Sequence, residues 1–222
     1  MPSVAAKKFR DKDALCFEGQ SFTFEELSNL IEKFSSSLHD LGIMQNDVVT
    51  LYASNSWEWI VSYFSIARIG AIINPVNTML TPSEVKHVVN DCKAKAIITS
   101  YDKASAIINI KNDTSVNTII SFGRAPQGTE EFNNLIKNEF QPVKMPNIIP
   151  EDLSTIGYTS GTTGHPKGAM QSHKSVVING AMTSQLHMRG PEDVVVSALP
   201  CPHVYANVLM TGMMMFGTKL VL

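Results

Sequence analysis

Short apolar runs of strand length alternate with amphipathic, helix-like segments along most of this 222-residue chain. The runs at 48–53, 71–75 and 96–99 are separated by stretches whose apolar residues recur every three or four positions. This alternation is typical of β-α-β units, in which parallel strands are connected by helices that cover both faces of the sheet. The sequence therefore predicts an α/β fold with mostly parallel sheets flanked by helices.

Two capping boxes mark the starts of two helices. Thr23 precedes Glu26 by three positions, and Thr81 precedes Glu84 by the same spacing, which lets each pair exchange hydrogen bonds at a helix N-terminus. We predict helices from these boxes to about residues 41 and 91. Periodicity and flanking residues predict further helices at 57–68, 103–108, 130–138, 172–188 and 205–216, and further strands at 14–17, 21–24, 118–122, 156–158, 193–199 and 219–222.

The segment Tyr158–Gly168 has the sequence YTSGTTGHPKG, rich in glycine and hydroxyl side chains and containing one lysine. Glycine lets the backbone approach a ligand closely, while hydroxyl groups and a lysine are suited to phosphate oxygens. The spacing differs from the Walker A pattern, because Gly161 and Gly164 are only three positions apart and Pro166 precedes the lysine. The composition predicts a phosphate-binding loop at the carboxyl end of a strand.

The complete eleven-residue run resembles the signature loop of the adenylate-forming enzymes, which include acyl-CoA synthetases, aryl-CoA ligases, luciferases and the adenylation domains of peptide synthetases. In that family the loop closes over the β- and γ-phosphates of ATP. His165 occupies a position that varies within the family motif, so it is given no role. The resemblance implies these ATP-binding residues: Thr159, Ser160, Gly161, Thr162, Thr163, Gly164 and Lys167.

Two further segments resemble motifs of the same family. Leu199–Tyr205, LPCPHVY, is similar to the second core motif, which implies that His203 faces the carboxylate and that Tyr205 contacts the acyl-adenylate. Pro202 departs from the family pattern, which usually has a bulky aromatic residue there, and this puts the local shape of the pocket in question. Gly70–Glu84 resembles a structural motif from the first half of fatty- and aryl-CoA ligases and is given no catalytic residue.

The three matches occur in the family's order and extend over almost the whole chain. They imply that residues 1–222 are an incomplete N-terminal AMP-binding domain, a truncated portion of the large domain of an adenylate-forming enzyme. The later family motifs are absent, including the glutamate that holds Mg²⁺, the aspartate that binds ribose and the catalytic lysine of the small C-terminal domain. No catalytic residue is therefore assigned within this chain, and the chain alone is expected to be inactive.

For the intact protein, the resemblance implies an ATP-dependent carboxylic acid–CoA ligase that forms an acyl-adenylate and then a thioester. The implied substrates and cofactors are ATP, Mg²⁺, coenzyme A and a small carboxylic acid, either fatty or aryl. One alternative is an amino-acid adenylation domain that loads a carrier protein, which a neighbouring carrier sequence would identify. Another is a truncated, non-enzymatic module that binds a nucleotide or an acyl group.

Charge and cysteine content exclude several other classes. A net charge of -2 gives no basic surface for nucleic acid. Cys16, Cys92 and Cys201 fit neither a zinc spacing nor a disulfide framework, which favours a reducing, cytoplasmic location. The histidines include no zinc-protease spacing, so no metal site is assigned. No segment is apolar enough to span a membrane; peripheral membrane contact and the oligomeric state stay open.

Overall fold

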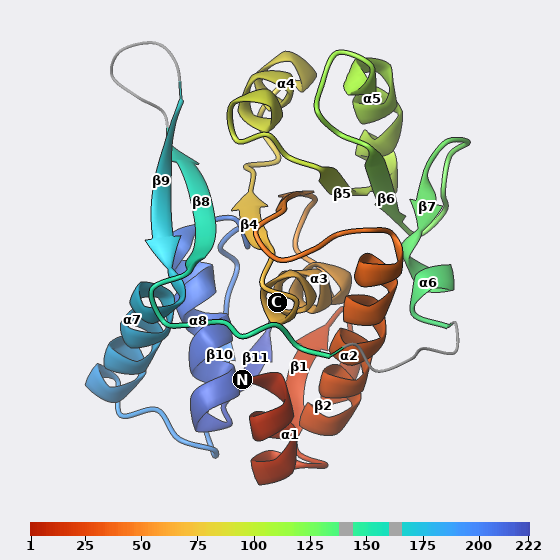
Figure 1. The fold of residues 1–222 in the computed structure, drawn as a ribbon. Coiled ribbons are helices and arrows are strands. Elements are labelled where there is room, and N and C mark those ends of the chain that lie inside the picture. The colour runs from red at the N-terminus through yellow and green to blue at the C-terminus, as the bar shows by residue number, and fades with distance from the viewer. Residues whose placement is uncertain (138–143, 160–165) are drawn as a thin grey trace.

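The computed structural model describes residues 1–137, 144–159 and 166–222, which form two sheets with helices between and around them (Figure 1). The helices are α1 (Pro2–Phe9), α2 (Phe24–Asp40), α3 (Trp57–Arg68), α4 (Pro82–Asp91), α5 (Tyr101–Lys111), α6 (Phe132–Leu135), α7 (His173–Leu186) and α8 (Val204–Phe216). The strands are β1 (Asp13–Phe17), β2 (Gln20–Thr23), β3 (Val48–Tyr52), β4 (Ile72–Pro75), β5 (Ala96–Ser100), β6 (Thr118–Phe122), β7 (Glu130–Glu131), β8 (Leu153–Thr159), β9 (Lys167–Ser172), β10 (Val194–Val196) and β11 (Lys219–Val221).

The larger sheet has the strand order β7-β6-β5-β3-β4-β8-β9, and its neighbours are parallel except for the final pair β8 and β9. The smaller sheet has the order β10-β11-β1-β2, in which only β1 and β2 run antiparallel. Both orders require crossover connections, which the helices supply. The predicted α/β fold with mostly parallel sheets is confirmed.

The central strands of the larger sheet are buried on both faces, as the alternation along β3 shows. Val49 and Leu51 belong to the core cluster that includes α2 and α3, whereas Val48 and Tyr52 belong to the cluster that includes α4 and α5. Figure 1 shows α4 and α5 on one side of this sheet and α3 on the other, between the two sheets. Successive side chains of a strand point to opposite faces of the sheet. A strand that is buried on both faces, such as β3, therefore needs a nearly continuous run of apolar residues.

Both predicted capping boxes are formed. The hydroxyl of Thr23 accepts a hydrogen bond from the backbone N–H of Glu26 at 3.1 Å, and the Glu26 carboxylate accepts one from the Thr23 backbone at 2.8 Å. Thr81 and Glu84 form the same pair of bonds at 3.3 and 2.7 Å. Each box satisfies backbone donors that a helix N-terminus leaves without intrahelical partners. The helices begin where the sequence predicts.

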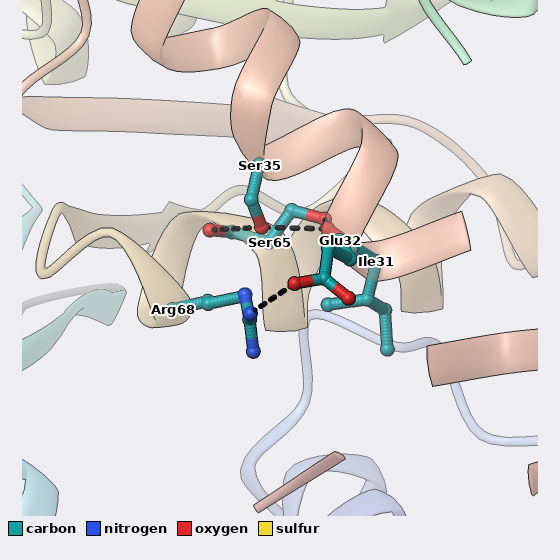
Figure 2. Close-up of polar contacts among 5 residues, drawn as sticks. All are labelled: Ile31, Glu32, Ser35, Ser65 and Arg68. Carbon is teal, nitrogen blue, oxygen red and sulfur yellow. Dashed lines mark hydrogen bonds and ion pairs between the residues drawn. The ribbon is translucent and has the colours of Figure 1, made fainter. Parts of the chain in front are cut away.

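Small polar residues bring α2 and α3 together, as Figure 2 shows. The hydroxyls of Ser35 and Ser65 both donate to the carbonyl oxygen of Ile31, at 2.6 and 3.0 Å. Next to them, the guanidinium of Arg68 forms an ion pair with Glu32 at 2.7 Å. These contacts fix α3 against α2 on one side, while the other side of α3 contributes to the cavity described below.

The structure differs from the predicted elements at 130–138, at the N-terminus and at β9, which follows the predicted phosphate loop. The helix predicted at 130–138 is wrong: Glu130 and Glu131 form β7, which pairs with β6, and only Phe132–Leu135 are helical, while residue 138 lies outside the described residues. Phe132 is fully buried between Phe34 and Phe122, with ring centroids at 4.5 and 5.3 Å, so tertiary packing determines this segment. The first helix, α1, was not predicted.

Helix α1 is held by contacts that are distant in sequence. The ring of Phe9 lies 5.1 Å from that of Phe24, and it also covers Gly217, where a Cβ atom would meet three Phe9 ring carbons at 2.5 to 2.7 Å. Gly217 has a φ of +75°, so any side chain there would be strained as well as crowded. Gly217 therefore allows α1 to pack against the end of α8.

We expect Gly217→Ala to destabilise the protein by about 2–4 kcal/mol, which combines the cost of a left-handed alanine with overpacking. Gly42→Ala is the matched control, since Gly42 has a φ of +80° and nothing lies within 4 Å of its added Cβ. The control should cost only the backbone term of about 1–2 kcal/mol. Chemical denaturation measures both free energies of unfolding, and equal values for the two variants would contradict the proposed contact with Phe9.

Candidate functional site

The predicted phosphate loop connects two antiparallel strands, β8 and β9 (Figure 1). Thr159 and Lys167 are Cα partners at the end of this ladder, so the two ends of the loop face each other. The sequence predicts a strand only at 156–158 before the loop and none after it, so β9 is a correction. Ser160, Gly161, Thr162, Thr163 and Gly164, predicted to bind ATP, lie outside the described residues.

The two faces of this β8–β9 hairpin have different roles. Thr155, Gly157 and Thr159 alternate along β8 and line a cavity of about 250 Å³, together with their β9 neighbours Ala169 and Gln171. Residues directly opposite each other in an antiparallel pair have side chains on the same face. Lys167, opposite Thr159, therefore continues the face of the hairpin that lines the cavity.

His203 reaches the same cavity from the start of α8. The remaining walls come from α3, the end of β4, β8, the segment before α8 and α8 itself. Their lining residues are Trp59, Tyr63, Pro75, Tyr158, Cys201, Pro202, Val204 and Asn207. The structure thus brings together Thr159 and His203, which are more than forty positions apart in the sequence. Tyr205, which was predicted to contact the acyl-adenylate, is 38% exposed and is not among the described residues that line the cavity.

The imidazole of His203 has a defined orientation. His203 is the N-cap of α8, and its Nδ1 atom accepts a hydrogen bond from the backbone N–H of Tyr205 at 3.2 Å. A ring nitrogen that accepts cannot carry a proton, so in the neutral ring the proton is on Nε2. His203 is therefore arranged to donate from Nε2 to an oxygen atom of a ligand while it caps the helix.

The α3 wall of the cavity is aromatic and rigid. Trp59 and Tyr63 stack with ring centroids 5.6 Å apart and planes at 15°, and both are almost completely buried. The side-chain amide of Asn207 donates to the Tyr63 hydroxyl, which links α3 to the second turn of α8. Burial raises the pKa of Tyr63 to about 12, so its phenol stays neutral. This wall can pack against an apolar group.

Asn74, from the predicted structural motif at 70–84, holds β8 in place. Its buried amide nitrogen donates to the carbonyl oxygen of Ile156 at 2.8 Å, and its carbonyl oxygen accepts from the hydroxyl of Thr50 at 2.9 Å. One side chain on β4 therefore connects β3 to β8. This contact stabilises the strand that carries the cavity-lining threonines.

The other face of the hairpin is anchored by Tyr158. Its hydroxyl donates to the carboxylate of Asp91 on α4, and burial with this hydrogen bond raises the pKa of Tyr158. The Tyr158 ring lies over Gly168 on the opposite strand: a Cβ atom at Gly168 would lie 3.2 Å from Cζ of Tyr158 and 2.9 Å from Cγ2 of Ile156. Glycine at 168 therefore leaves room for the ring that fixes the base of the loop.

We expect Gly168→Ala to displace the Tyr158 ring and to cost about 1–3 kcal/mol, the usual range for overpacking. Gly157→Ala is the matched control on the partner strand, because nothing lies within 4 Å of its added Cβ. It should leave the free energy of unfolding unchanged or raise it slightly, since glycine weakens strands. Urea denaturation of the two variants measures the difference, and a Gly168→Ala variant as stable as the wild type would contradict the close packing.

Several residues of the cavity were not predicted as site residues. Trp59 and Tyr63 belong to a helix whose apolar positions indicate only a core-facing surface, and Asn207 belongs to the helix after His203. Thr155 could have been recognised as a site residue, because Thr155, Gly157 and Thr159 are every second residue of one strand and therefore lie on the same face. That signal becomes informative only once β9 is known to pair with β8.

Within residues 1–137, 144–159 and 166–222, no group of three or more His, Cys, Asp or Glu side chains is arranged to hold a metal ion. None of the helices in the described part of the chain is both long and apolar enough to cross a membrane.

Comparison with known proteins identifies related sequences. The family model described as AMP-binding enzyme matches residues 3–222. The chain is 29% identical over 229 residues to 4-coumarate–CoA ligase 2 of Solanum tuberosum, covering 93% of this chain and 41% of that protein. It is 28% identical over 194 residues to the indoleacetate–CoA ligase of Aromatoleum aromaticum, covering 87% of this chain and 38% of that protein. The chain thus spans about two fifths of the length of these curated relatives.

A solved structure agrees with the sequence comparison. The anthranilate CoA ligase AuaEII, in complex with anthranoyl-AMP, superimposes with a TM-score of 0.90 at 26% identity. The match covers 100% of this chain and 44% of that one. The two sheets and their crossover helices are therefore shared with a protein that was crystallised with an aryl-adenylate.

Proposed function

This chain belongs to the AMP-binding enzyme family, and on that premise we propose that the protein containing it is an ATP-dependent carboxylic acid–CoA ligase. One observation carries the proposal: Thr159, beside the loop of family signature sequence, and His203, from the second motif, line the same cavity. Adenylation needs a site for phosphate oxygens next to a site for a carboxylate. This cavity places residues suited to both at one position.

In the proposed first step, a carboxylate oxygen of the acid attacks the α-phosphorus of ATP. An O–P bond forms, the bond from the α-phosphorus to the β-phosphate bridging oxygen breaks, and pyrophosphate leaves. Negative charge increases on the leaving group, so a cation and oriented hydrogen-bond donors beside it lower the barrier. We assign this role to Lys167 and to the hydroxyl of Thr159, which face each other across the hairpin.

His203 would act on the carboxylate. Its Nε2–H is free to donate while Nδ1 accepts from the Tyr205 backbone, so it can orient the attacking acid without exchanging its own proton. In the second step the thiolate of coenzyme A attacks the acyl carbon, a C–S bond forms, and AMP leaves with the carboxylate oxygen. Among the described residues, no group of three or more His, Cys, Asp or Glu side chains could hold Mg²⁺.

For the acid we propose an aryl or fatty carboxylic acid. The named relatives act on 4-coumarate and indoleacetate, and the AuaEII structure is named for anthranilate. The stacked rings of Trp59 and Tyr63 give the cavity an apolar wall against which an aromatic or alkyl group can pack. Because these relatives are CoA ligases, coenzyme A is favoured over a carrier protein as the acceptor.

The test supplies the complete protein with ATP, Mg²⁺, coenzyme A and a panel of aryl acids, fatty acids and amino acids. We expect AMP and an acyl-CoA thioester in equal amounts with at least one aryl or fatty acid. Formation of ADP in place of AMP, or no thioester with any acid of the panel, would refute the proposal. Adenylation of amino acids alone, without a thioester to coenzyme A, would indicate an adenylation domain that loads a carrier protein.

A further inference from the structure

The segment before His203 has few backbone groups with which to hold its shape. Pro200 and Pro202 lack backbone N–H groups, so Cys201 supplies the only backbone donor between Leu199 and His203. The segment leaves β10 and enters α8, and no strand or helix of the described chain includes residues 199–203. Its position therefore depends on side-chain contacts: the Cys201 side chain is buried in the core, and a second contact comes from another element.

Asn55 supplies this contact from the segment between β3 and α3. Its Nδ2 atom donates to the carbonyl oxygen of Leu199 at 2.9 Å, and its Oδ1 atom accepts from the N–H of Cys201 at 2.7 Å. One planar amide thus binds the backbone on both sides of Pro200, as another peptide group would. His203 follows directly, and its own N–H donates to the carbonyl oxygen of Pro200 at 2.9 Å.

The start of α3, next to Asn55, is itself held by hydrogen bonds. Ser56 is the N-cap of α3 and accepts from the backbone N–H of Trp59 at 3.2 Å, while Tyr63 on the same helix is bonded to Asn207. The region 55–63 therefore holds the chain before His203 through Asn55 and the chain after it through Tyr63. Asn55 does not line the cavity that His203 enters, so it acts on the imidazole only through the backbone.

We propose that Asn55 is a positioning residue that sets where the His203 imidazole enters the cavity. The inference rests on the proposed ligase function for its kinetic consequence, but not for its geometry. Loss of both hydrogen bonds of the Asn55 amide leaves the backbone N–H of Cys201 without a partner and leaves the buried Cys201 side chain as the remaining anchor of the segment, so His203 can shift with it. A shift of about 1 Å in a group that orients a substrate commonly costs on the order of 100-fold in rate.

The chain contains a matched control in Asn90. Its Nδ2 atom donates to the carbonyl oxygen of Asp113 at 3.0 Å, and its Oδ1 atom accepts from the N–H of Ser115 at 3.2 Å. This is the same two-bond contact, with the same spacing of two residues, on a loop between α5 and β6. If such an amide had a purely structural role, replacing Asn55 or Asn90 by alanine would change the activity of the protein equally.

The experiment compares Asn55→Ala, the nearly isosteric Asn55→Asp and Asn90→Ala in the complete protein. We expect kcat for thioester formation to fall roughly 10- to 100-fold in Asn55→Ala and less in Asn55→Asp, which keeps the acceptor for Cys201. Asn90→Ala should keep kcat within about twofold, as expected for a site with no connection to the chemistry. In a His203→Asn background, Asn55→Ala should add almost no further loss.

A second readout does not depend on activity. In protein labelled with ¹⁵N-histidine, the imidazole signals of His203, identified by their loss in His203→Asn, should shift in both Asn55 variants and stay in place in Asn90→Ala. Unchanged His203 signals in Asn55→Ala, or equal changes in Asn90→Ala, would overturn the positioning role. A wild-type protein without ligase activity would instead refute the proposed function, and the NMR comparison would still decide the role of Asn55.

Discussion

Lys167→Ala is expected to lower the rate of adenylate formation by roughly 100- to 1,000-fold, the range found when one stabilising group is removed from a developing charge. Lys167 lies directly opposite Thr159 at the end of the β8–β9 ladder, on the face of the hairpin that lines the cavity. Its side-chain ammonium forms no hydrogen bond or ion pair with the described residues, so it is available to a ligand. The charge should matter most for pyrophosphate departure.

The matched control for Lys167 is Lys174→Ala. Lys174 is an exposed lysine of α7 that forms an ion pair with Glu151 at 3.4 Å, and such surface pairs contribute only about 0–1 kcal/mol. Rapid-quench measurement of pyrophosphate release separates the adenylation step from later steps. Lys167→Arg should retain more activity than Lys167→Ala, because it keeps the charge. If Lys167→Ala and Lys174→Ala released pyrophosphate equally fast, the phosphate role of the hairpin would be wrong.

His203→Asn is expected to lower kcat by roughly 100-fold, as for loss of one oriented donor in a preorganised site, while the stability stays near that of the wild type. Asparagine is among the best N-cap residues, so this variant keeps the cap of α8 and removes the Nε2–H of a residue that lines the cavity. His203→Ala removes both groups. It should show the same kinetic loss with an additional cost of about 1 kcal/mol in the free energy of unfolding.

Steady-state kinetics together with chemical denaturation distinguish the two roles of His203. Tyr205→Phe serves as the comparison, because Tyr205 is partly exposed and lies outside the described lining of the cavity. We expect Tyr205→Phe to keep most of the wild-type kcat. A His203→Asn variant with unchanged kcat would show that the histidine is only a helix cap.

Local signals in the sequence were sufficient for the helices that begin with a capping box. Thr23 with Glu26 and Thr81 with Glu84 form contacts within four residues, so their chemistry is complete in the sequence itself. The buried strands β3 and β5 were likewise predictable from their continuous apolar runs. These local features also predicted the parallel sheet arrangement.

The elements that were missed depend on distant partners. Strand β9, KGAMQS, contains no alternating apolar pattern and few residues that favour strands, and it forms because it pairs with β8. Helix α1 lacks a side-chain cap and is held by Phe9, which contacts Phe24 and Gly217. The short helix α6 is set by the burial of Phe132. None of these contacts can be inferred from neighbouring residues.

The residues of the candidate site also differ in whether the sequence alone could identify them. Thr159, Lys167 and His203 could be identified by resemblance to family motifs, whereas the walls formed by Trp59 and Tyr63 required the three-dimensional packing of α3 against α8. The role of Asn55 was also invisible in the sequence, since it depends on a contact with residues more than 140 positions later. The motifs identified the candidate site residues, whereas the contacts that hold these residues in place became visible only in the fold.

We propose that the protein forms an acyl-adenylate in the cavity between the β8–β9 hairpin and His203. The most direct measurement is exchange of labelled pyrophosphate into ATP by the complete protein in the absence of coenzyme A. We predict exchange that requires an aryl or fatty acid and that falls strongly in both Lys167→Ala and His203→Asn. Exchange that proceeds equally without any carboxylic acid, or no exchange with an acid that the protein converts to its CoA thioester, would contradict this claim.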